Sequence, residues 1–141
     1  MNFEMVGPAI VLGLGLFGSC YGCGVAGKAC HAVMSRVDEG HGKFIGMSAA
    51  PSSQTIYAFV LMLLMSQKIT AGTLPPLSAI GIGLGAGFAI MASAIFQGQC
   101  AATGIYAAAR KPEIFGKCFA ALGIIESFAL FAFVFALLLM P

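Results

Sequence analysis

The sequence has few charged residues. Only 9% of its 141 residues are charged, whereas a typical soluble domain has about 25%. There is no Trp, and the seven Lys and Arg residues form no basic run, which argues against nucleic-acid binding. Apolar residues take the place of charge: 60% of the chain is hydrophobic and the mean hydropathy is +0.98. These values predict an integral membrane protein that is too small to hold a separate soluble domain.

Residues for enzymatic chemistry are also scarce. Cys20 and Cys23 have redox or metal spacing, but they lie in an apolar segment without a second pair of this kind. The odd count of five cysteines argues against a disulfide framework. His31 and His41 flank a predicted loop and are expected at the surface. Because no nucleophile–histidine pair or metal-ligand set is present, we expect a protein that is not an enzyme.

Four long apolar segments run through the chain, at about residues 3–32, 44–65, 77–109 and 114–140. Each exceeds the ~20 residues that a helix needs to cross a bilayer. The chain begins with Met-Asn-Phe-Glu and not with the basic region of a signal peptide, so the first segment is predicted to be a retained transmembrane helix. The sequence therefore predicts an all-α membrane protein with four transmembrane helices.

Basic residues indicate the orientation of these helices. The second connection contains only Lys68, whereas the first and third connections are flanked by several Lys and Arg residues. By the positive-inside rule, the connections between helices one and two and between helices three and four are cytoplasmic, and both termini lie outside. The residues at the first connection are Lys28, Arg36 and Lys43, and those at the third are Arg110, Lys111 and Lys117.

The two halves of the chain are repeats, which predicts one hairpin over residues 1–70 and a second over residues 71–141. A two-residue slip in the alignment pairs Gln54 of the first hairpin with Glu126 of the second, so only the second hairpin has the acid. Both hairpins have the same topology, unlike the inverted repeats of many secondary transporters. Before the slip, at an offset of 74, the aligned pairs are Gly7 and Gly81, Gly13 and Gly87, Gly24 and Gly98, Arg36 and Arg110, Glu39 and Glu113, and Lys43 and Lys117.

Small residues at helical spacing predict close helix packing in the first and third helices. They define two faces on each helix. Two such faces suit a helix held between neighbours on both sides, as in the inner wall of a ring, and packing within a four-helix monomer is the alternative. The glycines concerned are Gly15 and Gly27 on one face of the first helix, Gly18 and Gly22 on another, and Gly81, Gly83, Gly85 and Gly87 in the third helix.

Glu126 is a single carboxylate within one of the most apolar stretches. It lies nine residues beyond Lys117, which on a helix is about 13–14 Å, near the middle of a ~30 Å hydrocarbon layer. An ionised group at this depth costs on the order of several kcal/mol unless it is neutralised or paired. We therefore predict that Glu126 belongs to a functional site.

Other polar residues fall at a similar depth. Gln54 lies eleven residues beyond Lys43 and Gln97 lies thirteen before Arg110, so both are about 14–20 Å from the basic ends of their helices. We therefore expect Gln54 and Gln97 to reach the level of Glu126.

The second helix adds further oxygens. Ser53 and Tyr57 share one of its faces, and Tyr57 can donate a hydrogen bond to Glu126. Pro51 frees the backbone carbonyl about four residues earlier, so carbonyls around Met47 to Ala50 are candidate ligands.

These groups supply about five hard oxygens and one negative charge. This set suits Na⁺, because a divalent cation would demand more charge. A proton carrier needs less, since desolvation alone favours the protonated form of a carboxyl group. The polar companions favour Na⁺, and H⁺ is the alternative.

Three stretches resemble the membrane-ring subunit of V-type rotary ATPases, the c-type proteolipid or subunit K, and the prokaryotic branch most of all. One is Ile95-Phe-Gln-Gly-Gln-Cys-Ala-Ala-Thr-Gly-Ile-Tyr-Ala-Ala-Ala-Arg-Lys-Pro-Glu113, which resembles the third helix and its loop. The others are Gly-Ile-Ile-Glu126-Ser-Phe-Ala-Leu-Phe-Ala-Phe-Val, similar to the ion-carrying helix four, and Pro51-Ser-Ser-Gln54-Thr-Ile-Tyr57, similar to the helix-two signature. The resemblance extends over essentially the whole chain.

The resemblance implies a site and a set of partners. Glu126 would be the ion-binding carboxylate, Gln97, Gln54, Ser53 and the Ala50 carbonyl further Na⁺ ligands, and Tyr57 a hydrogen-bond donor to Glu126. Ser53 stands where the sodium-binding pattern of the family has Thr.

The resemblance also implies that identical copies of this chain would form a ring in the bilayer of a prokaryotic cell (inner) membrane. A basic residue of a stator subunit would favour ion release, and the cytoplasmic loops would contact a central rotor stalk. No permanent cofactor is implied, only the transported Na⁺ or H⁺.

Two other classes of membrane protein fit the sequence less well. A small four-helix proton-coupled exporter would need aromatic residues around a cavity near its acid, whereas this chain has no Trp and its glycines favour close packing. A pore-forming oligomer would need a polar stripe along a whole helix, and the sequence has none.

Overall fold

The computed structural model describes residues 3–141, and this part of the chain folds into helices joined by short connections. Four helical stretches are long and apolar enough to cross a membrane: Val6–Met34, His41–Thr70, Pro76–Arg110 and Pro112–Leu138. The prediction of an all-helical membrane protein with four spans is therefore confirmed. The spans match the predicted apolar runs to within five residues at each end.

The first hairpin consists of α1 (Val6–Met34), α2 (His41–Ala49), the short 3₁₀ helix η1 (Ala50–Ser52) and α3 (Ser53–Thr70). Pro51 explains the 3₁₀ turn, because it has no backbone N–H to donate and disfavours a regular α-helical turn. The local bonds shift accordingly, and the N–H of Ala50 donates to the carbonyl of Met47. The second span is therefore continuous but irregular at the level of Pro51.

The second hairpin consists of α4 (Pro76–Arg110), the 3₁₀ helix η2 (Pro112–Ile114) and α5 (Phe115–Leu138). Gly72, with φ of +74°, supports the tight turn between the hairpins, and Pro76 opens α4 at a position where its missing N–H has no helical partner. Pro112 follows the end of α4 and leads into the second turn.

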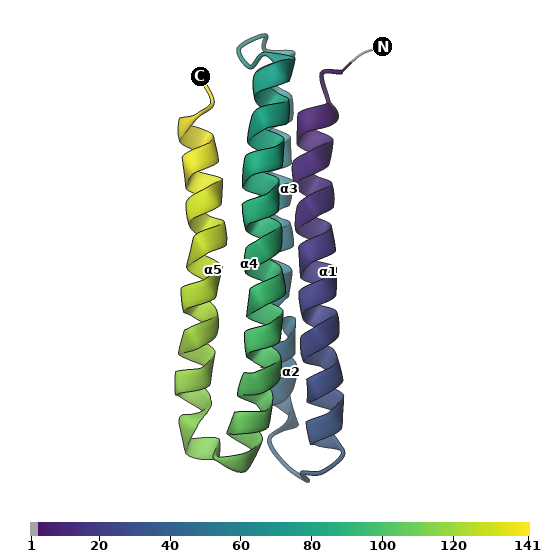
Figure 1. The fold of residues 1–141 in the computed structure, drawn as a ribbon, viewed down its shortest axis with the longest axis vertical. Helices are drawn as coiled ribbons and strands as arrows, with labels where there is room; N and C mark the ends of the chain where they lie inside the picture. The colour runs from purple at the N-terminus through teal and green to yellow at the C-terminus, as the bar shows by residue number, and fades with distance from the viewer. Residues whose placement is uncertain (1–2) are drawn as a thin grey trace.

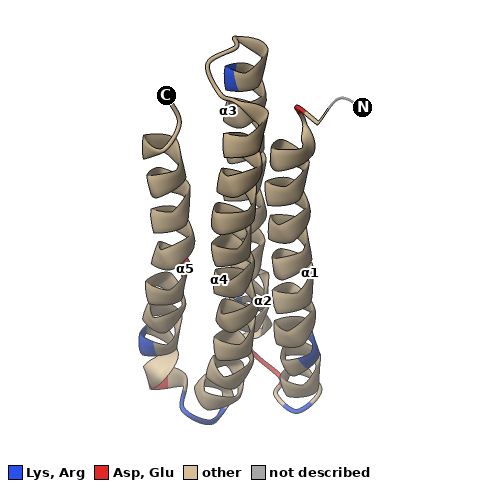
Figure 2. Cartoon of the chain, turned by 45° about the horizontal axis from the view of Figure 1, so that its top comes forward, with Lys and Arg blue, Asp and Glu red and all other residues tan. Residues whose placement is uncertain are grey.

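Figure 1 shows α4 between α1 and α5, with α3 behind them. The largest interface joins α1 to α4, while α3 packs mainly on α1 and α5 mainly on α4. Lys and Arg residues lie mostly at the end with the α1–α2 and α4–α5 connections, and Lys68 lies at the other end (Figure 2). We call the first of these the basic end.

Two clusters of buried apolar side chains fill the bundle, one toward each end. On α4, Ile90 belongs to one cluster and Ala101 to the other, and Ser93 and Gln97 lie between them. The fold thus holds a polar layer between two apolar layers.

Helix α5 packs against the rest of the chain along a narrow seam. Its buried residues are Leu122, Ala129 and Ala136, which are seven residues apart and so lie on one side of the helix. The remaining surface exposes large apolar side chains, among them Phe128, Phe131, Phe135, Leu138 and Leu139. Such a surface needs lipid or another protein chain to cover it.

Candidate ion-binding site

Glu126 on α5 meets Tyr57 on α3. The Tyr57 hydroxyl donates to Oε1 of Glu126 at 3.1 Å, and both residues are half-buried. The Tyr57 ring also packs near Phe133, with 6.2 Å between ring centroids. This contact joins the two hairpins across 69 positions of sequence at the level of the predicted acid.

Gln97 on α4 approaches the other oxygen of the same carboxylate. Its side-chain amide donates to the Leu122 carbonyl at 2.9 Å and lies 3.5 Å from Oε2 of Glu126. The second distance is long for a hydrogen bond, so the Leu122 carbonyl is the stronger partner. Glu126 therefore has a neutral donor on each oxygen.

Gln54 on α3 lies behind Gln97, and both side chains are fully buried. The Gln54 amide donates to Oε1 of Gln97 at 3.0 Å and to Oγ of Ser93 at 3.4 Å. The structure thus brings Glu126, Tyr57, Gln97 and Gln54 into one hydrogen-bonded network.

Ser53 and the Ala50 carbonyl lie at the edge of this network. The Ser53 hydroxyl is within bonding distance of the Ala50 carbonyl, at 3.1 Å, and of Oε1 of Gln54, at 3.2 Å. The Ala50 carbonyl also accepts the backbone N–H of Ser53. Its two lone pairs are therefore engaged unless the Ser53 hydroxyl turns wholly to Gln54, which makes this carbonyl the least available of the predicted ligands.

Ser93 is a member of the network that sequence reasoning missed. It is 5% exposed, and its hydroxyl donates to the Ile125 carbonyl at 2.9 Å while accepting from Gln54. Two signals could have identified it: Ser93 lies one helical turn before Gln97, and the 74-residue offset aligns it with Ser19. Ser19 is also buried, but its hydroxyl has no hydrogen-bond partner among residues 3–141.

The network leaves lone pairs free for a cation. An amide oxygen has two lone pairs, and Oε1 of Gln54 and Oε1 of Gln97 each accept one hydrogen bond. The carboxylate offers about four acceptor sites, of which Tyr57 and Gln97 take two. Oxygens with one negative charge fit a hard monovalent cation. No group of three or more His, Cys, Asp and Glu residues that could hold a metal ion occurs within residues 3–141.

The predicted packing glycines separate into two groups. A Cβ added at Gly15, Gly18 or Gly22 of α1, or at Gly83 or Gly87 of α4, would meet other atoms of the same chain. At Gly22 the obstacle is the α4 backbone at Ala94 and the ring of Pro51. A Cβ at Gly27, Gly81 or Gly85 would meet nothing. Helix α4 thus has one glycine face inside the chain and one outside, whereas Gly15, Gly18 and Gly22 of α1 all pack inside.

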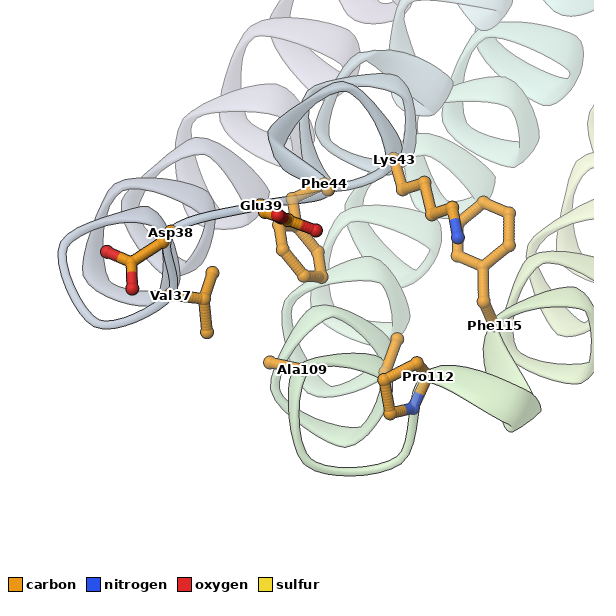
Figure 3. Close-up of a pocket in the computed structure, with 10 residues that line it drawn as sticks. Val37, Asp38, Glu39, Lys43, Phe44, Ala109, Pro112 and Phe115 are labelled. Carbon is orange, nitrogen blue, oxygen red and sulfur yellow. The ribbon is translucent and has the colours of Figure 1, made fainter.

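A groove of about 470 Å³ opens at the basic end, between the two connections. Figure 3 shows Asp38 and Glu39 on one side of the groove, with Phe44 beside Glu39, and Phe115 on the other side next to Lys43. The Lys43 ammonium lies 5.6 Å from the centre of the Phe115 ring, a cation–π contact between the hairpins. The groove combines an apolar interior with an acidic edge.

These observations define a multi-pass helical membrane protein made of two hairpins, with a carboxylate network in the middle of the bundle. The chain belongs to the ATP synthase C-subunit family, whose model matches it twice, over residues 6–65 and 80–139. The two matches confirm the tandem duplication.

Two curated proteins are similar over nearly the whole chain. The V-type sodium ATPase subunit K of Enterococcus hirae is 29% identical over 141 residues, which span 99% of this chain and 90% of that protein. The A-type ATP synthase subunit K of Methanocaldococcus jannaschii is 31% identical over 135 residues, which span 96% of this chain and 60% of that protein. The resemblance to V/A-type ring subunits is confirmed, as is the prediction of a non-catalytic, ion-translocating component of a larger complex.

Proposed function

We propose that this chain is a rotor-ring subunit of a V/A-type rotary ATPase that carries Na⁺ across the membrane by reversible binding at Glu126. The observation that carries the proposal is the carboxylate of Glu126, bonded to Tyr57 and close to Gln97 in the polar layer between two apolar clusters. A bare carboxylate at this depth is unfavourable, so Glu126 enters lipid only when a cation neutralises it.

The transport cycle consists of ion binding, ion release and rotation of the ring. Na⁺ binds between Glu126 and the free lone pairs of Gln97, Gln54 and Ser53, and Tyr57 holds the carboxylate in place. A basic residue of the stator subunit favours release of the ion into one half-channel, and a new ion loads from another. Rotation follows because only neutralised sites re-enter lipid. Each Na⁺ that moves through 100 mV exchanges about 2.3 kcal/mol, so several ions accompany each ATP, hydrolysed or synthesised.

The choice of Na⁺ rests on the surplus of oxygens. A proton would need only the carboxylate, yet two fully buried amides and a hydroxyl join the network. The similarity to a V-type sodium ATPase subunit supports the same choice. The alternative is the same ring coupled to H⁺.

The internal repeat supports assembly into a ring. Three aligned glycine pairs each have one member packed inside the chain and one open to the outside: Gly7 and Gly81, Gly87 and Gly13, and Gly98 and Gly24. The contact between α1 and α4 within the chain is therefore available again between the outer edge of α4 and the outer edge of α1 in the next copy. Because the contact joins two different edges, it is a head-to-tail contact. Copies joined in this way close into a ring when the rotation from one copy to the next divides a full turn evenly.

The remaining parts of the proposal concern orientation and partners. The basic end faces the cytoplasm of a prokaryotic cell, and both termini lie outside, because Lys and Arg gather at that end. The acidic-edged groove between the connections (Figure 3) is the surface that contacts the central rotor stalk.

Radioactive sodium binding to the purified oligomer tests the proposal. Equilibrium dialysis at neutral pH is expected to find one Na⁺ per chain, and Glu126→Gln is expected to abolish binding while the oligomer remains intact. Proton release on titration, with no sodium bound, would replace the sodium assignment by the proton one. Negative-stain class averages separately test assembly, since a dimer in place of a ring of many copies would favour a small proton-coupled exporter.

A further inference from the structure

A second pocket lies at the basic end, between the ends of α1 and α4. Its volume is about 170 Å³, and it is lined by Arg36 from the first hairpin and by Tyr106 and Arg110 from the second. Ala32, Val33 and Ala109 add apolar surface. Arg36 and Arg110 are aligned by the repeat, so the duplication brings two equivalent guanidinium groups to one pocket.

The guanidinium and hydroxyl groups of this pocket are unpaired in the described part of the chain. Within residues 3–141, neither the two guanidinium groups nor the Tyr106 hydroxyl form an ion pair or a hydrogen bond with another residue. The nearby carboxylates of Asp38 and Glu39 line the neighbouring groove of Figure 3, which shares Val37 and Ala109 with this pocket. The pocket therefore contains two positive charges and unused donors, without a carboxylate in its lining.

Guanidinium donors match the oxygens of phosphate in geometry and charge. Attraction to the C-terminal ends of α1 and α4 does not by itself explain why two arginines line this pocket. The last carbonyls of α1 and α4 attract cations, but they accept no hydrogen bond from either guanidinium. A small anion that accepts hydrogen bonds from both arginines would pair with these unused donors and balance their positive charge.

The level of the pocket in the bundle points to the source of such an anion. Arg110 is the last residue of α4, where the membrane-crossing stretch ends, which is the depth of lipid headgroups. Phe88, which is exposed, lies eighteen residues before Tyr106 and hence on the same face five turns away. An acyl chain below a bound headgroup would run along this apolar face.

We propose that Arg36, Arg110 and Tyr106 form a binding site for a phosphate-bearing anion, supplied either by the headgroup of an anionic phospholipid or by free phosphate. The site is separate from the Glu126 network and does not depend on the choice of transported ion. Basic pockets between transmembrane helices are a recurrent form of anionic-lipid recognition.

Lipid binding to the purified oligomer tests this site. Oligomer in neutral detergent is titrated with phosphatidylglycerol or phosphatidylcholine, and bound lipid is counted by native mass spectrometry. Wild type is expected to prefer phosphatidylglycerol. The double variant Arg36→Gln/Arg110→Gln is expected to bind it about 25-fold more weakly, from roughly fivefold for each arginine near a charged surface.

The matched control is Lys111→Gln/Lys117→Gln, which removes two positive charges at the same end but outside the pocket. Neither lysine lines the pocket, so this control removes no donor from it and is expected to change binding less than about threefold, as is typical of exposed charges. Equal losses in the two double variants, or no loss in either, would overturn the proposal.

Inorganic phosphate that competes with phosphatidylglycerol identifies free phosphate as the ligand, and failure to compete identifies the phospholipid. Gel filtration and circular dichroism check that each variant assembles and folds.

Discussion

At the scale of residues, neutral groups surround the one carboxylate of the membrane core. Tyr57 and Gln97 donate to its two oxygens, and Gln54 reaches it only through Gln97. Neutral donors stabilise the anion without cancelling its charge, so the carboxylate remains able to attract a cation. A Lys or Arg in their place would hold the site permanently neutral.

Tyr57→Phe tests the donor on Oε1. The change keeps the ring that packs near Phe133 and removes a hydrogen bond of 3.1 Å. The hydroxyl holds the carboxylate in position, so its loss is expected to weaken cation binding. Na⁺ affinity is expected to fall roughly tenfold, in line with about 1.5–3 kcal/mol for a bond to a charged group. Isothermal titration calorimetry with Na⁺ measures the affinity, with Phe133→Leu as the control. An unchanged affinity would contradict the role of Tyr57.

Ser93→Ala and Ser19→Ala form a matched pair, because the repeat aligns the two serines. Ser93→Ala removes the acceptor of a Gln54 N–H and the hydroxyl that donates to the Ile125 carbonyl. It is expected to lower the free energy of unfolding by about 1–3 kcal/mol. Ser19→Ala removes a buried hydroxyl that has no partner among residues 3–141, and is expected to be neutral or stabilising. Thermal unfolding in detergent compares them. Equal destabilisation would mean that the Ser19 hydroxyl has a partner that this network does not include.

At the scale of elements, the close approach of α1 and α4 sets the geometry of the whole bundle. A Cβ at Gly98 would meet the backbone of Gly22, and one at Gly83 would meet the backbone of Gly7. Because backbone atoms cannot move aside as a flexible side chain can, these positions require glycine. Because α3 packs mainly on α1, the packing of α1 against α4 helps to set the level of Gln97 relative to Gln54.

Gly98→Ala is expected to separate α1 from α4 and to lower stability by about 1–3 kcal/mol, as overpacking does. Its repeat counterpart, Gly24→Ala, adds the same methyl group where nothing lies within 4 Å. Gly24→Ala is therefore expected to leave the fold of a single chain unchanged. Chemical denaturation of the dissociated monomer in detergent, followed by circular dichroism, distinguishes the two. If both monomeric variants unfold alike, α1 and α4 do not approach each other closely at Gly98.

Much of the fold could be predicted from the sequence, because long apolar runs, basic connections and the repeat each constrain it independently. The polar cluster could be predicted from depth alone, since similar spacings from the basic ends put Gln54, Gln97 and Glu126 at about one level. The role of Ser93 could not, because it depends on how α4 is rotated toward α3 and α5. The separation of the glycines into inner and outer faces also depends on which helices pair.

At the scale of the whole molecule, a single chain leaves much apolar surface uncovered. Helix α5 has one buried seam, and α1 and α4 each leave glycines open to the outside. The repeat relates these open edges to the contact that is already made inside the chain. The family implies that the chain is one part of a larger assembly, and we propose that this assembly repeats the internal packing.

Gly85→Leu is expected to block that assembly, because it puts a large side chain on the outer edge of α4 where the next copy would pack. The fold of the single chain is expected to persist, since a Cβ at Gly85 meets nothing within it. Gel filtration with multi-angle light scattering measures the oligomer, and circular dichroism the helices. The control is Gly46→Leu, which adds the same bulk in open space on α2. An oligomer of unchanged size in Gly85→Leu would rule out this edge as the contact.

The central claim is that Glu126 binds the transported Na⁺, and carbodiimide labelling tests it most directly. Dicyclohexylcarbodiimide modifies protonated carboxyl groups in apolar surroundings, and the modified residue is identified by mass spectrometry of the purified oligomer. We predict that Glu126 is modified, that Na⁺ slows the reaction at fixed pH, and that K⁺ at the same ionic strength does not. Labelling of Glu126 that accelerates at lower pH but is unaffected by Na⁺ would contradict the sodium site.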